Sequence, residues 1–150
     1  MKKFRFSLET VLDYKQQALD ALQVEHGAIL AQVKAQEAEI QEMEAAYRHL
    51  NGEFARRKLE GITIVDAMKY DQYLRAMERQ LEEAYQHLEL LKQQAEEKRQ
   101  EVVEAKKETS SIEKLREKKL DGYNKALQKS EEAMIDELVS TKRVMAAQSA

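Results

Sequence analysis

Residues 67–112 read AMKYDQYLRAMERQLEEAYQHLELLKQQAEEKRQEVVEAKKETSSI, and the spacing of the apolar side chains in this stretch decides the fold. Mostly apolar positions recur at alternating steps of three and four residues, beginning with Ala67, Tyr70 and Leu74 and ending with Thr109 and Ile112. This heptad spacing is typical of a helix that packs along another helix. Because the sequence contains no proline, we expect one long helix from about residue 64 to 140, with residues 142–150 frayed.

The first third of the chain carries a matching heptad pattern. Ser7 is a candidate N-cap, with Phe6 and Val11 at the positions of a hydrophobic staple, so we expect a helix over about residues 7–60. A period of 3.5 residues predicts a left-handed supercoil. The expected interface positions are Leu8, Leu12, Lys15, Leu19, Leu22, His26, Ile29, Val33, Gln36, Ile40, Met43, Tyr47, Leu50, Phe54 and Arg57.

The break between the two patterns predicts a short turn over residues 61–63. Gly61 can take the left-handed conformation that ends a helix, and Thr63 with Asp66 resembles a capping box that starts the next one. A connection this short makes the helices antiparallel neighbours. The predicted fold class is therefore all-α, a long antiparallel two-helix coiled-coil hairpin that forms a single elongated domain over residues 1–150.

Reflection of the sequence about Gly61 predicts the register of this hairpin. Ser7 should lie opposite about Leu115, Leu22 opposite residues 95–98, and Tyr47 near Leu74. Roughly 25–30 residues of the second helix would then extend past the first, on the order of 40 Å.

The pattern changes after Ile112. Apolar side chains then recur every eleven residues at Ile112, Tyr123, Met134 and Met145, with Leu127 and Leu138 beside them, which predicts a nearly straight helix. Ser110 with Glu113 could form a capping box that breaks the helix here. We expect instead an unbroken helix with a local stutter.

Composition excludes several classes of protein. The chain has 35% charged residues, a net charge of −3 and no cysteine, so duplex nucleic acid is not an expected partner and no disulfide can form. No run approaches the 18 apolar residues that a membrane-spanning helix needs. Glu9 and Asp13 come directly after the basic N-terminus, where a signal peptide would have its apolar run. We expect a soluble, cytoplasmic protein.

Catalytic and cofactor motifs are absent from the sequence. There is no phosphate-binding glycine loop, and His26, His49 and His87 are too scattered to form a local metal site. Adjacent carboxylates such as Glu82-Glu83 and Glu96-Glu97 fit ordinary helix surface charges. We therefore expect no enzyme activity, no cofactor and no metal, and a function exerted by contact.

Two contact surfaces stand out. At the open end of the hairpin, Phe4 and Phe6 accompany a basic cluster that could enter an acidic, ring-shaped partner; the alternative is a solubilising face with a staple. The cations are Lys2, Lys3, Arg5, Lys114, Arg116, Lys118, Lys119, Lys125 and Lys129.

The second surface is the tip of the hairpin, where branched and aromatic residues are concentrated. They could bind a partner or merely close the end of the coil, and we favour binding because a turn needs less apolar surface than this. The tip residues are Ile62, Ile64, Val65, Met68 and Tyr70, with Tyr47 and Tyr73 nearby.

Several segments resemble the flagellar export protein FliJ family over almost the full chain. They are FRFSLETVLDYKQQ at residues 4–17, Gly61-Ile62 followed by KYDQYL at 69–74, EVVEAKKETSSIEKLREKKLDGY at 101–123, and MIDELV at 134–139. The resemblance implies a non-enzymatic, cytoplasmic component of the flagellar type III protein export apparatus, peripheral at the inner face of the cell membrane through its partners.

The same resemblance implies partners. Family members look like the coiled-coil part of a rotary ATPase central stalk and dock in the centre of the export ATPase hexamer (FliI-like, with its regulator). There they promote the assembly and activity of the hexamer. They also contact the export gate protein FlhA and bind export chaperones.

These implied contacts fall on specific positions of this chain. The gate surface of the family matches Tyr47, Tyr73, Met77, Gln80 and Ala84. For the ATPase we expect Phe4, Arg5, Lys114, Arg116, Lys118 and Lys119 at the open end.

Other classes remain open at this point. A stalk protein of a virulence type III secretion system has the same shape and differs only at its ends. A generic coiled-coil chaperone or scaffold would explain the heptads but not the basic open end or the apolar tip. A prefoldin-like holdase joins its helices through β-hairpins, for which residues 61–65 are too few.

Overall fold

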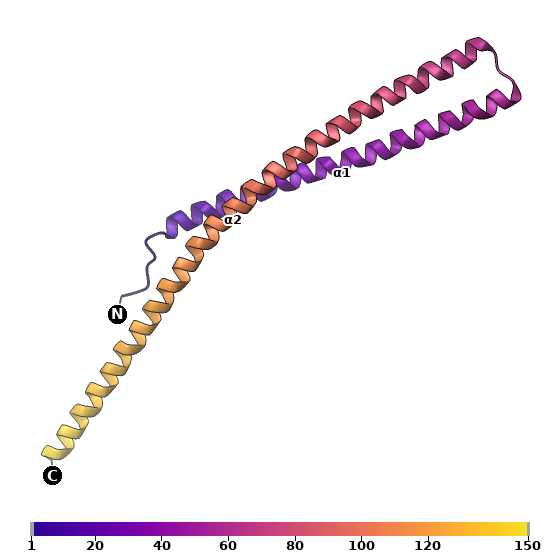
Figure 1. Cartoon of the computed structure of the whole chain (residues 1–150). Helices are drawn as coiled ribbons and strands as arrows, with labels where there is room; N and C mark the ends of the chain where they lie inside the picture. The colour runs from indigo at the N-terminus through magenta and orange to yellow at the C-terminus, as the bar shows by residue number, and fades with distance from the viewer. Residues whose placement is uncertain (1, 150) are drawn as a thin grey trace. The chain divides into compact units, whose positions relative to one another are not determined.

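The computed structural model describes residues 2–149 and consists of two helices, α1 (Glu9–Glu60) and α2 (Ile64–Gln148), as Figure 1 shows. No strand occurs in the described residues, so the predicted all-α hairpin is confirmed. The chain divides into two compact units, and each contains parts of both helices. We call Met1–Leu19 with Glu104–Ala150 the open-end unit, and Asp20–Val103 the tip unit.

The turn of the tip unit is built as the sequence predicts. Gly61 has a φ of 103°, a left-handed conformation that glycine adopts without steric cost. The hydroxyl of Thr63 accepts a hydrogen bond from the amide of Asp66 at 3.1 Å, and the Thr63 carbonyl accepts one from the Ala67 amide at 3.0 Å. Thr63 is therefore the N-cap of α2, and the predicted start at Ile64 is confirmed.

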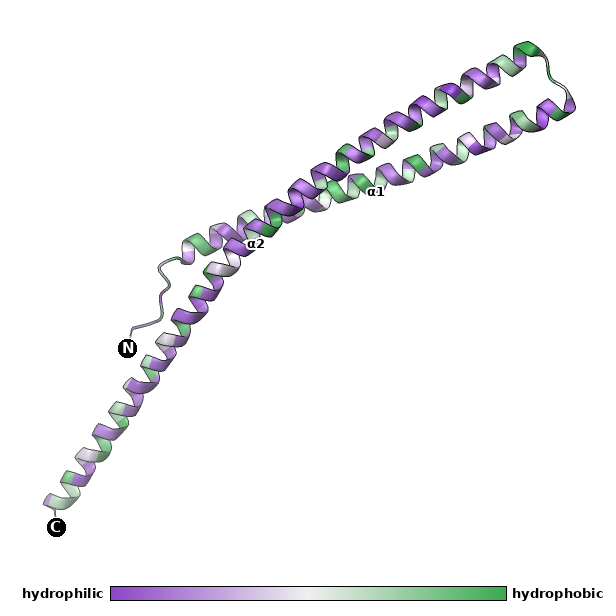
Figure 2. Cartoon of the chain, in the orientation of Figure 1, coloured by the Kyte–Doolittle hydropathy of each residue, from purple (hydrophilic) through white to green (hydrophobic). Residues whose placement is uncertain are grey.

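The helices of the tip unit pack along the predicted interface positions. Those positions are buried or half-buried with one exception, Arg57, which is exposed and lies over the ring of Tyr70, 5.9 Å from its centroid. Figure 2 shows apolar positions recurring singly between hydrophilic ones on both helices. The buried core of this unit consists of Ile40, Phe54, Leu74, Leu88, Leu91 and Ala95.

Polar contacts between the helices fix the register of the tip unit. The amide of Gln36 donates to the Ala84 carbonyl at 3.0 Å, so this polar interface residue is satisfied by the facing backbone. Lys98 pairs with Glu25 at 3.0 Å. Since Leu22 was expected opposite residues 95–98, the register agrees with the prediction to within about one helical turn.

The paired part of the open-end unit is held in the same way. Leu19 and Thr109 are buried, and the Thr109 hydroxyl donates to the Ala105 carbonyl at 2.8 Å within α2. Lys15 pairs with Glu108 at 2.9 Å, and Arg116 pairs with Glu9 at 2.9 Å. The Glu9 pair places the start of α1 close to the expected position opposite Leu115.

Both helix ends at the open end differ from the prediction. The Leu12 amide donates to the Leu8 carbonyl at 2.8 Å, so Leu8 rather than Ser7 is the N-cap of α1. The reason is that residues 7 and 8 form a turn, which carries Phe6 into a buried position.

The C-terminal end of α2 also lies later than expected. The helix passes residues 110–113 unbroken, as predicted, but it continues to Gln148 rather than ending near residue 140. Neither glycine nor proline follows Gly122, and the terminal turns contain Ala146 and Ala147, so no residue stops the helix.

Candidate functional site

The N-terminal segment, residues 2–8, is docked on α2 through contacts with Tyr123 and Arg116. The ring of Phe4 packs against that of Tyr123, with centroids 5.7 Å apart and planes tilted by 53°. The Tyr123 hydroxyl donates to the Lys2 carbonyl at 2.5 Å, and Phe6 is buried. These contacts give the segment a defined course beside α2.

Arg116 connects this segment to both helices. Its guanidinium pairs with Glu9, and its Cζ atom lies 5.6 Å from the centroid of the Phe4 ring. Sequence reasoning assigned Arg116 to a partner and missed this internal role. The signal was available: Arg116 follows Ile112 by four residues, which places it on the interface face of α2.

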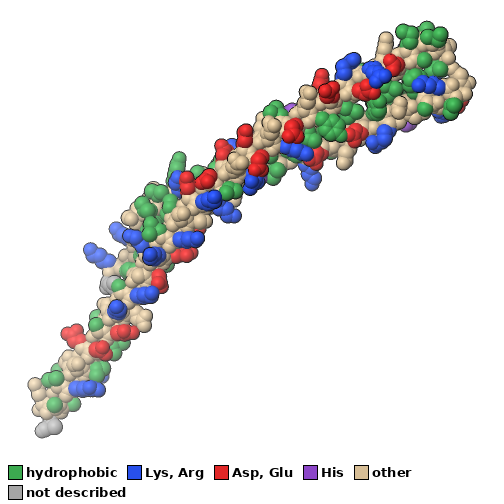
Figure 3. Space-filling view, viewed as in Figure 1, with side chains coloured by type: hydrophobic (Ala, Val, Ile, Leu, Met, Phe, Trp, Pro, Cys, Tyr) green, Lys and Arg blue, Asp and Glu red, His purple; other side chains and the backbone are tan. Residues whose placement is uncertain are grey.

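Among the remaining cations of the open end, Lys125 pairs with Asp121 at 3.1 Å within α2. Lys114, Lys118 and Lys119 are exposed and form no ion pair with any described residue. A hollow of about 830 Å³ is lined by Lys2, Lys3, Phe4, Arg5 and Tyr123. Figure 3 shows Lys and Arg side chains gathered on this part of the chain. The structure thus brings together the aromatic and basic residues that were predicted for one end.

The tip carries the exposed apolar side chains that were predicted for it. Ile64, Val65 and Met68 are exposed, and Leu59, which the sequence analysis did not single out, is 90% exposed. Tyr70 has a different role, because it is half-buried and stacks on Phe54 with centroids 5.0 Å apart and planes 3° from parallel. Tyr70 therefore closes the end of the coil and Ile62 is half-buried, whereas Ile64, Val65 and Met68 remain accessible.

The predicted gate residues lie along one edge of the interface between the helices. Tyr73, Met77, Gln80 and Ala84 follow one another at steps of four, three and four, so they share one stripe of α2. Tyr73 and Gln80 are exposed, whereas Met77 and Ala84 are half-buried. The partial burial of Met77 follows from its position on the packed heptad face of α2.

Tyr47, the gate residue on α1, is held by a hydrogen bond across the interface. Its hydroxyl donates to Glu78 at 2.7 Å, and Arg75 donates to the same carboxylate at 3.0 Å. These two hydrogen bonds hold the pKa of the Glu78 carboxyl below its usual range, and the bond to Glu78 raises the pKa of Tyr47. The carboxylate is therefore ionised and fully engaged at neutral pH, which fits a positioning role rather than acid–base chemistry.

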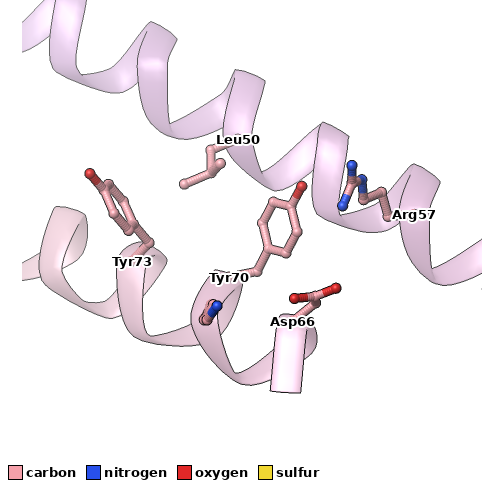
Figure 4. A pocket seen from close by; sticks show the side chains of 6 residues that line it. Leu50, Arg57, Asp66, Tyr70 and Tyr73 are labelled. Carbon is pink, nitrogen blue, oxygen red and sulfur yellow. The ribbon is translucent and has the colours of Figure 1, made fainter. Parts of the chain in front are cut away.

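A shallow groove of about 220 Å³ lies beside Tyr73 (Figure 4). Its floor and walls come from both helices, with Leu50 and Arg57 on α1 and Tyr70 and Tyr73 on α2; Asp66 and Lys69 complete the lining. The groove combines apolar rings with one acid and two bases, so it suits a short segment of another protein better than a reactive small molecule.

Residues 2–149 contain no group of three or more His, Cys, Asp or Glu side chains that could hold a metal ion. Neither of the two helices combines the length and apolar character needed to cross a membrane.

Residues 4–148 match the model of the family described as Flagellar FliJ protein. Searches of curated proteins and of solved structures gave no match. The matched region includes both helices, the turn and residues 4–8 of the docked N-terminal segment. The chain therefore belongs to the flagellar FliJ protein family, whose members are non-catalytic components of the flagellar type III export apparatus.

Proposed function

We propose that this protein docks through its open end in the centre of the export ATPase hexamer (FliI-like) and promotes the assembly and activity of the hexamer. The observation that carries the proposal is the group of three unpaired, exposed lysines, Lys114, Lys118 and Lys119, beside the docked N-terminal segment. Arg5 adds a further exposed cation on that segment.

Charge is a suitable means of contact between one rod and a six-fold ring. A single copy cannot interlock its side chains with six identical subunits at once, because the symmetries differ. Long-range attraction between Lys or Arg and an acidic channel tolerates this mismatch. The attraction should weaken as salt rises towards physiological strength, where the Debye length falls to about 8 Å.

The tip serves a second partner in this proposal. Tyr73 and Gln80 line an exposed edge next to the groove, and we assign this edge, with Tyr47, Met77 and Ala84, to the export gate protein FlhA. Export chaperones and the regulator of the ATPase are further partners. Through these contacts the protein would lie at the inner face of the cell membrane at the flagellar base.

The ATPase contact is tested by charge reversal. The variant Lys114→Glu/Lys118→Glu/Lys119→Glu should lose co-elution with the hexamer and stimulation of ATP turnover. Arg116 is left intact, because its reversal would undock the N-terminal segment. The matched control reverses three exposed cations of the tip unit, Lys34, Arg48 and Arg79, which likewise form no ion pair with any described residue. Full stimulation by the first variant at physiological salt would refute the proposal.

The gate contact is tested at one residue. Tyr73→Ala should lower affinity for the cytoplasmic part of the gate by tenfold or more, as expected for an aromatic anchor. Tyr14 offers a matched control, because Tyr14 and Tyr73 are both 69% exposed. Equal affinities of the two alanine variants would show that the tip edge is not the gate site.

A further inference from the structure

The last part of α2, residues 128–148, has no helix beside it within the open-end unit. Every described residue from Gln128 onward is exposed, although the segment remains helical to Gln148. At 1.5 Å per residue this extension is about 30 Å long. It exposes six large apolar side chains, namely Met134, Ile135, Leu138, Val139, Val144 and Met145.

These side chains continue the interface face of α2. Leu120, Tyr123 and Leu127 are half-buried. Met134 follows Leu127 by seven residues, and Leu138 and Met145 follow at further steps of four and seven, so all lie on the same face. The helix face that packs in the rest of the unit therefore continues into residues 128–148, where it is exposed. A second helix could take that place.

Two charged residues on this face indicate what kind of helix could pack against it. Glu131 follows Leu127 by four residues and precedes Ile135 by four, so it lies within the apolar stripe. Lys142 lies in the stripe at its other end, four residues after Leu138. Both are exposed, and neither pairs with any described residue. The stripe thus carries one acid at one end and one base at the other.

We propose that the extension pairs with the extension of a second copy of this chain in an antiparallel arrangement. Each Glu131 then faces Lys142 of the other copy, and Met134, Ile135, Leu138 and Val139 form the apolar centre between the two ion pairs. A parallel pair would instead oppose Glu131 to Glu131 and Lys142 to Lys142, which is unfavourable. The inference rests on the extension alone, and the dimer would be a separate state from the proposed ATPase-bound form, in which one copy docks through the same end.

The association should be weak. The contact includes about five turns of each helix, an area at or below the lower limit of stable interfaces. We therefore expect a reversible dimer that is visible only at high protein concentration.

Sedimentation of the full chain at increasing concentration tests the proposal, with charge variants as probes. Glu131→Lys should weaken association at least tenfold, because it places Lys opposite Lys142. The double variant Glu131→Lys/Lys142→Glu should restore it. Asp136→Lys is the charge-matched control on the opposite face of the extension, and it should leave association unchanged. A chain that stays monomeric up to ~0.3 mM would overturn the proposal.

Cross-linking determines the direction of the pair, since the chain has no cysteine of its own. A mixture of Glu131→Cys and Lys142→Cys chains should form mixed disulfides. Each variant alone should form few. Disulfides within the Glu131→Cys sample, at the level of the mixture, would indicate a parallel pair and contradict the inference. Association that persists in Leu138→Glu would also contradict it, because that change puts charge in the apolar centre.

Discussion

Two stretches of the same helix differ in what covers them. Between Leu74 and Ala95 in the tip unit, the heptad residues of α2 pack against α1 and are buried or half-buried. Between Gln128 and Gln148 in the open-end unit, residues with similar spacing are exposed. The difference teaches that apolar spacing determines which face of a helix is an interface, but it does not determine the partner.

The two stretches also differ in what stabilises them. In the tip unit, apolar burial is combined with cross-helix bonds such as Gln36 to the Ala84 carbonyl at 3.0 Å. The extension lacks such cross-helix bonds to any described residue, and helix propensity is marginal for a segment of about 20 residues in water. Its continuity with the packed part of α2 supplies the helix nucleus that an isolated peptide lacks.

Alanine substitutions at Ile40 and Leu138 should show the largest difference in stability between the two stretches. Ile40 is 4% exposed, so Ile40→Ala should lower the free energy of unfolding by about 2–3 kcal/mol through lost packing. Leu138 is 60% exposed, so at low protein concentration Leu138→Ala should change the free energy of unfolding by about 0.5 kcal/mol or less. Urea denaturation measures both values, and similar losses would refute the distinction between packed and unpaired stretches.

Substitution of two glycines by alanine should have opposite effects. Gly61 has a φ of 103°, so Gly61→Ala should destabilise the turn by about 1–2 kcal/mol. Gly122 lies inside α2 with open space around it, so Gly122→Ala should stabilise the helix by up to about 1 kcal/mol. Thermal unfolding followed by circular dichroism gives the sign of each change. A stabilising Gly61→Ala would be incompatible with the observed turn.

The smallest expected effect concerns pH and the Tyr47–Glu78–Arg75 contact of the tip unit. The pKa of Glu78 is lowered in the folded chain, first by the Tyr47 hydrogen bond and then by that of Arg75. A lowered carboxyl pKa contributes stability above its ordinary value of 4.5, and this stability is lost as pH falls through the folded pKa.

Glu78→Gln should therefore lower the melting temperature slightly at pH 7 and not at strongly acidic pH. Glu82→Gln is the control, because Glu82 is exposed and has no described partner. A loss of the same size for Glu78→Gln at both pH values would show that ionisation of Glu78 does not matter to the fold.

Much of the paired structure could be predicted from sequence because each part follows from a local rule. Gly61 and Thr63 specify the turn, and the heptad positions specify the faces that pack. The N-terminal segment could not be placed in this way, because the docking of Phe4 on Tyr123 depends on contact between residues far apart in sequence. The role of Arg116 was missed for the same reason. The helix end was placed too early, since exposed positions give no packing signal and only propensity remained.

The central claim is that the open end binds the export ATPase and the tip binds the export gate. Site-specific photocross-linking tests this claim most directly. A photoreactive amino acid placed at Lys119, in the open-end unit, should cross-link to the export ATPase and not to the export gate. The same amino acid at Tyr73, in the tip unit, should cross-link to the gate and not to the ATPase. Cross-linking of the ATPase from Tyr73 with none from Lys119 would contradict the account.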